Sequence, residues 1–316
     1  MEEFVPKNGD KLFPIEWIYG MNTDVKSFFY KRAGYLLLVP GIVILLFLVI
    51  YPLARSIWMS LHTMYLAKPK QFPFVGLRNY YLLLFEDQVF RIALRNTMVI
   101  VIVAVPTEFF LGLLLATQLN REDIKGRKIF RAILVLPIAL MPIVVGVLWK
   151  FMLHPRYGIV NFGLGLLGIN PIQWVADPRF ALLSVMVVDI WEWTPFMVLV
   201  LYAGFISLPK EPIEAARMDG ASDWQLFVHI SFPLVLPIVV VAILIRIMDI
   251  IKMFDIVYVL TRGGPGDSTE LLSLYDFRVG LNYFYMGKAA ALSWIIVILV
   301  TILAQVFLRV VKFEKR

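Results

Sequence analysis

The fold is decided by the segment PKEPIEAARMDGASDWQLFVHISFP, residues 209–233, together with what lies on either side of it. The segment is polar, yet long apolar runs precede it at 181–205 and follow it at 234–257. Each run is long enough to cross a bilayer core of about 30 Å, which takes ~20 helical residues. The sequence therefore predicts two membrane-spanning helices joined by a connection much longer than a tight turn.

The composition of the whole chain agrees with a membrane protein. Of its 316 residues, 60% are hydrophobic and only 17% are charged, and the mean hydropathy is +0.80. Soluble domains are nearer half apolar and a quarter charged. The net charge of +7 comes from basic residues that flank the apolar runs, which indicates membrane topology and not nucleic-acid binding. Cysteine is absent, which excludes disulfides, thiolate metal sites and a thiol nucleophile.

Six apolar stretches are long enough to span the membrane. They lie at 35–60, 92–117, 129–152, 181–205, 234–257 and 288–309. Only helices fit, because unpaired backbone groups are too costly in lipid and the runs are continuous, not alternating. We therefore expect an all-α, polytopic membrane protein with six transmembrane helices. Prolines at Pro40, Pro106, Pro142 and Pro195 are expected to kink the spans.

The distribution of Lys and Arg predicts the orientation of these spans. Basic residues are more numerous on the side that carries both termini and the segment 206–232. The tightest basic cluster on that side consists of Arg121, Lys125, Arg127, Lys128 and Arg131. We expect a multi-pass protein of the cytoplasmic membrane with both termini inside. Residues 1–33 do not resemble a cleaved signal peptide, and they are either an interfacial segment or a disordered tail.

The segment 209–233 contains helix start and stop signals in a definite order. Pro209 or Pro212 fits the first turn of a helix, where a missing N–H group costs nothing. Gly220 is typical of a helix end in the left-handed conformation. Ser222 followed by Gln225 is a capping-box pattern. The order predicts a helix at about 209–221, a sharp turn and a second helix leading into the next span, with an ordinary amphipathic loop as the alternative.

The same segment resembles the signature of permease subunits of ATP-binding-cassette (ABC) importers. That signature is Glu-Ala-Ala, three residues, Gly, nine residues, then Ile-x-x-Pro; the chain has Phe232 where the family often has Leu. In that family the segment is the cytoplasmic coupling helix that docks on an ATPase subunit. The resemblance implies a coupling role for Glu214, Ala215, Ala216, Asp219 and Gly220.

Two further motifs are similar to the carbohydrate-uptake branch of that family. They are Trp191-x-x-x-Pro195-Phe196 and Phe254-Asp255-x-x-Tyr258-x-Leu260-Thr261-x-Gly263-Gly264-Pro265. The branch imports sugars, oligosaccharides, polyols or glycerol phosphate. Outer loops of such permeases meet a substrate-binding protein, which implies that contact for Arg262, Gly263, Gly264 and Pro265, whereas a flexible connector is the alternative.

The resemblance covers about residues 35–310 and implies a division of the chain. The parts are a tail at 1–33, a first span with its external loop at 34–90, a type I permease core at 91–310 and a cytoplasmic C-terminus at 311–316. The implied partners are two copies of an ABC ATPase, a second permease (a heterodimer is favoured), an extracytoplasmic substrate-binding protein and lipid. No Gly-x-x-x-x-Gly-Lys-Ser/Thr loop is present, so we expect a non-enzymatic chain without cofactor or metal, with ATP and Mg on the ATPase.

Ionisable residues inside the spans are costly and therefore candidates for a translocation path. The ionisable candidates are Asp189, Glu192, Arg246, Asp249, Lys252 and Asp255, and Trp193 is a further candidate as an aromatic face on which a sugar could stack. A helical rise of ~1.5 Å per residue places Glu192 and Arg246 at similar depth, where they could pair. Arg246 with Asp249, and Lys252 with Asp255, are also i,i+3 neighbours of opposite sign. The alternative is that these charges only hold helices together, and Glu108 and Arg95 are expected to make packing or terminal contacts.

Two other classes of membrane protein are weaker interpretations. An ion-coupled secondary transporter of a small polar solute would require paired, interrupted helices in related halves. A membrane-embedded enzyme would require a nucleophile, a metal set or paired acids. Gly264-x-Gly266-Asp267 and Tyr275-Asp276 mimic the motifs of intramembrane aspartyl proteases. Both acids fall in one stretch, 258–287, which is predicted to be an external loop, and they are therefore not expected to face each other from two buried helices.

Overall fold

The structure is a computed structural model that describes residues 38–68, 72–120 and 126–310. The predictions for 1–33, 311–316, Arg121 and Lys125 lie outside the described residues. The chain forms two compact units, Met1–Ser56 and Ile57–Arg316. Each is described by itself below.

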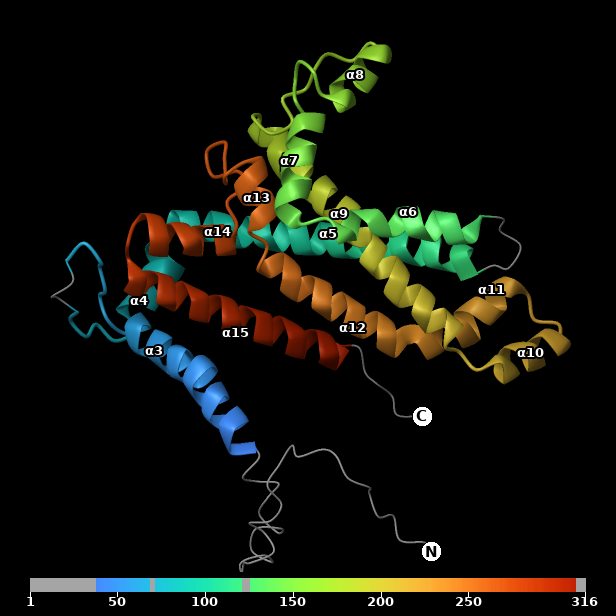
Figure 1. The fold of residues 1–316 in the computed structure, drawn as a ribbon, viewed down its shortest axis with the longest axis horizontal. Helices are drawn as coiled ribbons and strands as arrows, with labels where there is room; N and C mark the ends of the chain where they lie inside the picture. The colour runs from blue at the N-terminus through green and yellow to red at the C-terminus, as the bar shows by residue number, and fades with distance from the viewer. Residues whose placement is uncertain (1–37, 69–71, 121–125, 311–316) are drawn as a thin grey trace, which may run out of the picture. The chain divides into compact units, whose positions relative to one another are not determined.

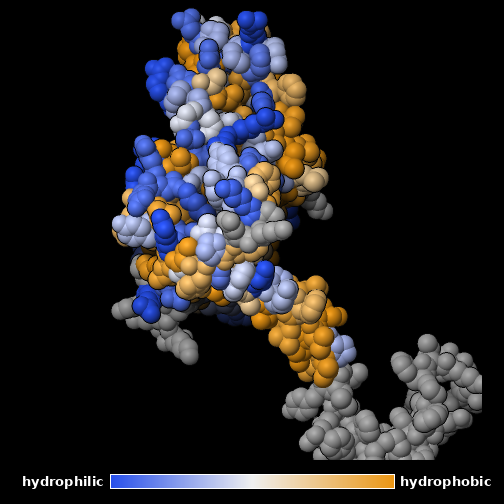
Figure 2. All heavy atoms as spheres, turned by 90° about the vertical axis from the view of Figure 1, so that its left-hand side faces the viewer, coloured by the Kyte–Doolittle hydropathy of each residue, from blue (hydrophilic) through white to orange (hydrophobic). Residues whose placement is uncertain are grey.

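The first unit contributes an apolar helix. The helical run Leu38–Ser60 includes the π-helical turn η1 (Leu46–Ile50) and leads into α3 (Tyr51–Ser60). None of the large apolar side chains from Leu38 to Leu53 is buried, and the face of the helix seen in Figure 2 is mostly apolar. A helix that is apolar all round suits lipid or another membrane helix.

The second unit is a bundle of helices (Figure 1). Its elements are α4 (Arg78–Tyr81), η2 (Leu82–Glu86), α5 (Gln88–Asn120), α6 (Arg127–Ala139), α7 (Pro142–Met152), α8 (Ile159–Leu166), α9 (Pro178–Ile206), α10 (Lys210–Met218), α11 (Asp223–Leu226), η3 (Phe227–Ser231), α12 (Phe232–Ile251), α13 (Asp255–Leu260), α14 (Leu272–Phe277), η4 (Arg278–Asn282) and α15 (Met286–Val310). Among the described residues, β pairing is limited to isolated bridges of His62 with Phe74 and of Tyr65 with Tyr285. The all-α prediction is confirmed.

The number of spans agrees with the sequence. Five helices in the described part of the chain are long and apolar enough to cross a membrane, and the pair α6–α7 makes a sixth span if it is counted as one bent unit. Its two halves meet at 99°. The bend follows from Pro142, because the residue before a proline is disfavoured in the helical region, and Met141 is indeed extended at ψ 137°. Pro106 and Pro195, by contrast, lie inside the continuous helices α5 and α9.

The fifth span is interrupted, which the sequence did not predict. We expected one helix over 234–257, but α12 ends at Ile251 and α13 begins at Asp255. Phe254 at the break has a non-helical backbone, with φ −130° and ψ −55°. The hydroxyl of Ser273 donates to the carbonyl oxygen of Met253, so a neighbouring segment satisfies one backbone group that the break leaves free.

The core of the bundle is the crossing of α5 and α9, with α12 against both. Gly112 of α5 makes this crossing possible, because a Cβ at that position would lie 2.6 Å from Cβ of Met197 on α9. Small residues let membrane helices approach closely where apolar burial alone supplies no driving force. Ala104 and Ala116, on the same helix, are fully buried.

The stretch 258–287, predicted to be a polar loop, is partly helical. It contains α14 and η4, and α14 packs against α5 and α15. Leu272 and Tyr275 of α14 are buried. Asp276 is half-buried and accepts a 2.5 Å hydrogen bond from Ser293 on α15. The loop prediction is therefore wrong for 272–282, which α14 and η4 occupy.

Candidate functional site

The connection between α9 and α12 folds as a helix, a turn and a second helix. α10 follows Pro209 and ends just before Gly220, whose φ of +85° is the left-handed conformation that favours glycine. Ser222 then caps α11, and together with Gln225 it forms both hydrogen bonds of a capping box. The predicted order of helix, left-handed glycine and capping box is confirmed.

This segment is open to a partner. α10 lies at one end of the bundle, and none of its residues is buried (Figure 1). Glu214, Ala215, Asp219 and Gly220 are exposed, and Ala216 is half-buried. Sequence reasoning missed Met218, whose exposed fraction is 89%. The signal available was a large apolar residue at the end of a mostly polar helix, which also contains Ile213.

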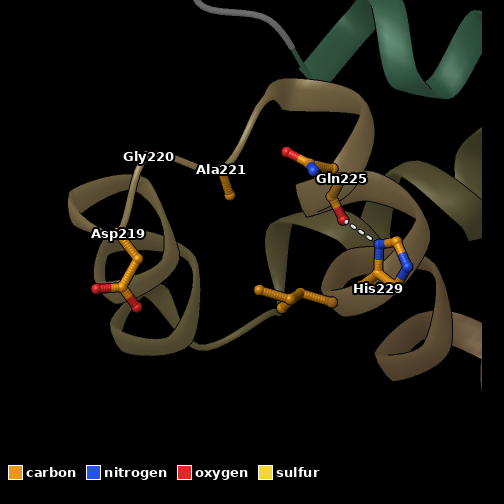
Figure 3. Close-up of a pocket in the computed structure, with 6 residues that line it drawn as sticks. Asp219, Gly220, Ala221, Gln225 and His229 are labelled. Atoms are coloured by element: carbon orange, nitrogen blue, oxygen red, sulfur yellow. Dashed lines mark hydrogen bonds between the residues drawn. The ribbon is translucent and has the colours of Figure 1, made fainter.

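A shallow pocket of about 350 Å³ separates the end of α10 from α11 and η3 (Figure 3). It is lined by Asp219, Gly220, Ala221, Gln225, His229 and Ile230. The imidazole Nδ1 of His229 lies 3.1 Å from the carbonyl oxygen of Gln225, which fixes the ring at the pocket wall. The turn thus presents a concave polar surface beside the exposed helix.

At the crossing of α5, α9 and α12, one guanidinium joins two carboxylates. Nε of Arg246 donates to Oε2 of Glu108 at 2.6 Å, and one Nη group donates to Oε1 of Glu108 at 2.7 Å. The same Nη group donates to Oδ2 of Asp189 at 2.9 Å. The three side chains are at most 2% exposed. The ring of Trp193 covers the guanidinium, with 4.6 Å from Cζ to the ring centroid.

These contacts correct the pairs expected from sequence. Arg246 was expected to pair with Glu192 or Asp249, yet its hydrogen bonds go to Glu108 and Asp189. Glu108 was expected to make only a packing or terminal contact. The available signal was that it lies well inside an apolar span, where an acid requires a partner.

The remaining path candidates surround the break between α12 and α13. Glu192 is buried, and its Oε2 has no hydrogen-bond partner. Lys252 pairs with Asp249 at 3.6 Å and is largely exposed. The predicted pairing of Lys252 with Asp255 does not occur, because the helix ends between them and Asp255 lies in the first turn of α13.

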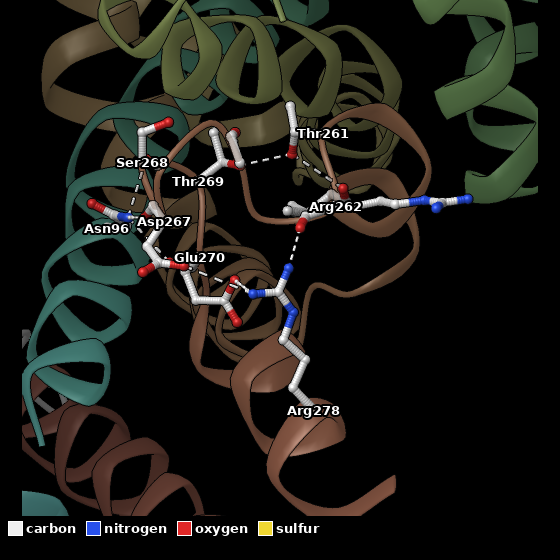
Figure 4. Close-up of polar contacts among 10 residues, drawn as sticks. Asn96, Thr261, Arg262, Asp267, Ser268, Thr269, Glu270 and Arg278 are labelled. Carbon is white, nitrogen blue, oxygen red and sulfur yellow. Dashed lines mark hydrogen bonds and ion pairs between the residues drawn. The ribbon is translucent and has the colours of Figure 1, made fainter. Parts of the chain in front are cut away.

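The turn after α13 is held to α5 by one amide (Figure 4). Nδ2 of Asn96 donates to the carbonyl oxygens of Asp267, Ser268 and Glu270 at 3.1–3.2 Å. Within the turn, the hydroxyl of Thr269 lies 2.7 Å from that of Thr261. The turn is thus tethered to α5, and sequence reasoning missed Asn96.

Of the four residues expected to meet a binding protein, Arg262 presents the most surface. Its side chain is exposed and points away from the rest of the cluster (Figure 4). Gly264 and Pro265 are half-buried. Gly263 is buried at φ +81°, and a Cβ there would collide with Glu270, so this glycine shapes the turn instead of offering surface.

Glu270 is a buried acid in the turn and forms an ion pair with Arg278. Burial raises the pKa of its carboxyl to about 7, even though Arg278 opposes the shift from 2.8 Å. Neither carboxylate oxygen accepts a hydrogen bond of good geometry, so the Arg278 contact is an ion pair. Arg278 also donates to the carbonyl oxygen of Arg262. The cluster therefore links the exposed turn to the helix bundle.

The described residues contain no group of three or more His, Asp or Glu side chains that could hold a metal ion. The chemically distinctive regions of this chain are the exposed segment α10–α11, the buried charges at the crossing, and the tethered turn 261–271.

Comparison with known proteins places these features in one family. The model of the "binding-protein-dependent transport system inner membrane component" family matches residues 108–313. The chain is 38% identical over 291 residues to the trehalose/maltose transport system permease protein MalF of Thermococcus litoralis, covering 90% of this chain and 96% of that one. It is 32% identical to the sulfoquinovosyl glycerol transport system permease protein SmoG of Agrobacterium fabrum, covering 89% and 91%.

A solved structure shares the fold. The fold resembles a bacterial ABC transporter involved in the import of the acidic polysaccharide alginate, with a TM-score of 0.79 and 23% identity over 93% of this chain and 100% of that one. The family model covers the crossing, the exposed segment and the tethered turn together. The chain belongs to the family of inner membrane components of binding-protein-dependent transport systems.

Proposed function

We propose that this chain is the permease subunit of an ABC importer that moves a carbohydrate across the cytoplasmic membrane by alternating access. The observation that carries the proposal is the exposed, capped helix–turn–helix α10–α11, in a chain 38% identical to a trehalose/maltose permease. Trehalose, maltose and sulfoquinovosyl glycerol in the relatives' names support a carbohydrate substrate.

The proposed mechanism couples α10 to the buried crossing. ATP binding brings together two ATPase subunits, which are separate from this chain. α10 contacts an ATPase subunit and moves with it, and the contact residues are Glu214, Ala215, Ala216, Asp219 and Gly220. α10 connects to α12 through the capped helix α11 and η3, so movement of α10 reaches the crossing with α5 and α9. The substrate passes between α9 and the α12–α13 break.

The proposed assembly has further partners. A second permease subunit, favoured to be a different chain, completes the path, and a substrate-binding protein docks at the turn that carries Arg262. Both termini and α10 lie in the cytoplasm, and the 262–265 turn lies outside. ATP and Mg bind to the ATPase, and this chain is not itself an enzyme.

The rival class of ion-coupled transporters predicted interrupted helices, and two spans here are indeed interrupted, at 140–141 and at 252–254. Those breaks do not favour it, however, because the family match covers both. The exposed α10 supports dependence on a docked ATPase.

Coupling is tested with proteoliposomes that contain the complete complex and its binding protein. Gly220→Pro forces φ from +85° to about −65° and destroys the turn. We expect ATP-driven uptake of radiolabelled trehalose or maltose to fall at least tenfold. Gly168→Pro is the matched control, because Gly168 also has a positive φ, +74°, but lies far along the chain from α10. Unchanged uptake in Gly220→Pro would overturn the docking role.

Sidedness and docking are tested with single cysteines, which are unique on this chain because it has none of its own. Met218→Cys should react with a membrane-impermeant thiol reagent only from the cytoplasmic side, and Arg262→Cys only from the outside. Met218→Cys should also cross-link to the ATPase. Labelling of both positions from one side would contradict the proposed topology.

A further inference from the structure

Buried acids outnumber buried bases at the crossing. Glu108, Asp189 and Glu192 supply three carboxylates, and Arg246 is the single cation hydrogen-bonded among them in the described structure. Both Nε and an Nη group of Arg246 are engaged by Glu108 and Asp189, and Trp193 covers the face of the guanidinium. The second Nη group of Arg246 is engaged by neither acid, yet no hydrogen bond joins it to Glu192, whose Oε2 has no hydrogen-bond partner among the described residues.

Glu192 has a position that suits contact with a ligand. It lies one helical turn from Asp189 on the same face of α9. Its charged neighbours are Asp189, Arg246 and Asp255, so the carboxylate lies where α9 meets the α12–α13 break. The residue is 1% exposed and its Oε2 has no hydrogen-bond partner. A buried acceptor of this kind requires a donor, and movement of α9 against the break would uncover it.

The other charges around the break do not reverse the negative balance. Asp249 is a charged neighbour of Asp189 and forms a 3.6 Å ion pair with Lys252. The Lys252 side chain is 64% exposed, so solvent screens it. Asp255 adds a further negative charge at the start of α13.

We propose that Glu192 is a specificity-determining residue that accepts a hydrogen bond from a hydroxyl of an uncharged saccharide, and that the surrounding excess of acids rejects anionic saccharides. This inference rests on the proposed function, and it sharpens the substrate class. The family resemblance leaves that class open, because the relatives and structural neighbours include both a trehalose/maltose permease and an importer of an acidic polysaccharide.

The substrate-binding protein also selects ligands, so the test must measure the permease alone. The complex of both permeases and the ATPase is placed in nanodiscs without binding protein and trapped with ATP and vanadate. Saturation-transfer NMR then measures the Kd of trehalose, of maltose, and of a trehalose analogue in which one C6 hydroxymethyl is oxidised to a carboxylate. We expect the wild type to bind a neutral disaccharide at least tenfold more tightly than the carboxylate analogue.

Two variants separate the roles of charge and shape. Glu192→Gln keeps an acceptor oxygen but removes the charge, and should reduce the preference for the neutral sugar at least threefold. Glu192→Ala should weaken binding of the neutral sugar at least tenfold. Glu86→Gln, at an exposed acid outside the crossing, is the matched control and should change neither value. Basal ATPase activity confirms that each variant assembles.

The outcomes are distinct from those of the uptake experiment. Equal binding of neutral and anionic sugars by the wild type, no binding of either neutral disaccharide, or an unchanged preference in Glu192→Gln would overturn the inference. ATP-driven uptake by the wild type would then still support the proposed function. Absence of uptake in the complete system would instead count against the proposed function.

Discussion

Nε of Arg246 lies 2.6 Å from Oε2 of Glu108, although the two residues are 138 positions apart in the chain. The contact joins α12 to α5, and a second hydrogen bond from Arg246 reaches Asp189 on α9. Three helices therefore meet at one buried guanidinium. Removing it leaves two carboxylates without a counter-charge.

Arg246→Met should strongly destabilise the chain. Breaking a buried ion pair by removing one partner costs about 3–5 kcal/mol, because the other charge stays buried. Thermal unfolding in detergent, followed by fluorescence-detected size-exclusion chromatography, measures the loss. Adding Glu108→Gln to Arg246→Met should recover part of it. Lys252→Met is the control, and its exposed pair should contribute less than about 1 kcal/mol. Equal effects of the two single variants would contradict this role for Arg246.

Gly112→Val should separate α5 from α9. A Cβ at Gly112 would lie 2.6 Å from Cβ of Met197, and overpacking a core typically costs about 1–3 kcal/mol. The unfolding temperature measures the effect. Gly163→Val is the matched control, because a Cβ there meets no atom within 4 Å. A wild-type unfolding temperature in Gly112→Val would show that the crossing is less tight than described.

Asn96→Ala should release the turn 261–271. The amide of Asn96 donates to three carbonyl oxygens, and leaving buried acceptors unpaired costs about 1–3 kcal/mol. Hydrogen–deuterium exchange should increase in peptides that cover this turn. Thr107→Ala, which loses only a hydrogen bond to its own helix, should leave that exchange unchanged. No increase in Asn96→Ala would mean that other contacts suffice to hold the turn.

Stability should decrease as pH rises from about 4.5 to about 7. Burial raises the pKa of Glu270 from 4.5 to about 7, so the folded state binds this proton more tightly than the unfolded state does. The stabilisation is complete below pH 4.5 and is lost as pH rises through about 7. Asp276, whose pKa burial raises to about 6, acts in the same direction. Between pH 4.5 and 7 the unfolding temperature should decrease less in Glu270→Gln than in the wild type. The same decrease in both proteins would contradict the assignment of this pH dependence to Glu270.

Met218→Asp should weaken coupling without unfolding the chain. The side chain is 89% exposed on α10, where a charge costs the fold little. If Met218 inserts into an apolar site on the ATPase, the carboxylate should reduce ATP-driven uptake at least fivefold at a wild-type unfolding temperature. Val228→Asp, at an exposed apolar residue of η3, is the control. Equal uptake by both variants would exclude an anchoring role.

The sequence predicted correctly those features that depend on interactions between neighbouring residues. The left-handed Gly220 and the capping box of Ser222 with Gln225 depend on a few neighbouring residues, and both are present. Apolar run length likewise predicted the spans. Pro142 marked the position of a bend, but its 99° angle depends on how the two halves pack.

The contacts that were missed depend on residues far apart in the chain. The i,i+3 spacing predicts ion pairs only between residues of the same helix. Arg246 on α12 instead binds Glu108 on α5 and Asp189 on α9. Asn96 was unremarkable in sequence, because its three acceptors lie more than 170 positions away. Glu192 was identified as a candidate, but its unpartnered oxygen is visible only once Arg246 is seen to be engaged elsewhere.

The interruption at 252–254 has a mechanical consequence. On its N-terminal side, α12 is connected through η3 and α11 to the exposed helix α10. On its C-terminal side, α13 leads into the turn that Asn96 fastens to α5. Three residues thus separate α12 from α13, and each helix keeps its own backbone hydrogen bonds if the angle between them changes. Under the proposed coupling, movement of α10 would rotate α12 about Lys252–Phe254, beside the carboxylate of Glu192, while α13 stays fastened through the turn that Asn96 holds.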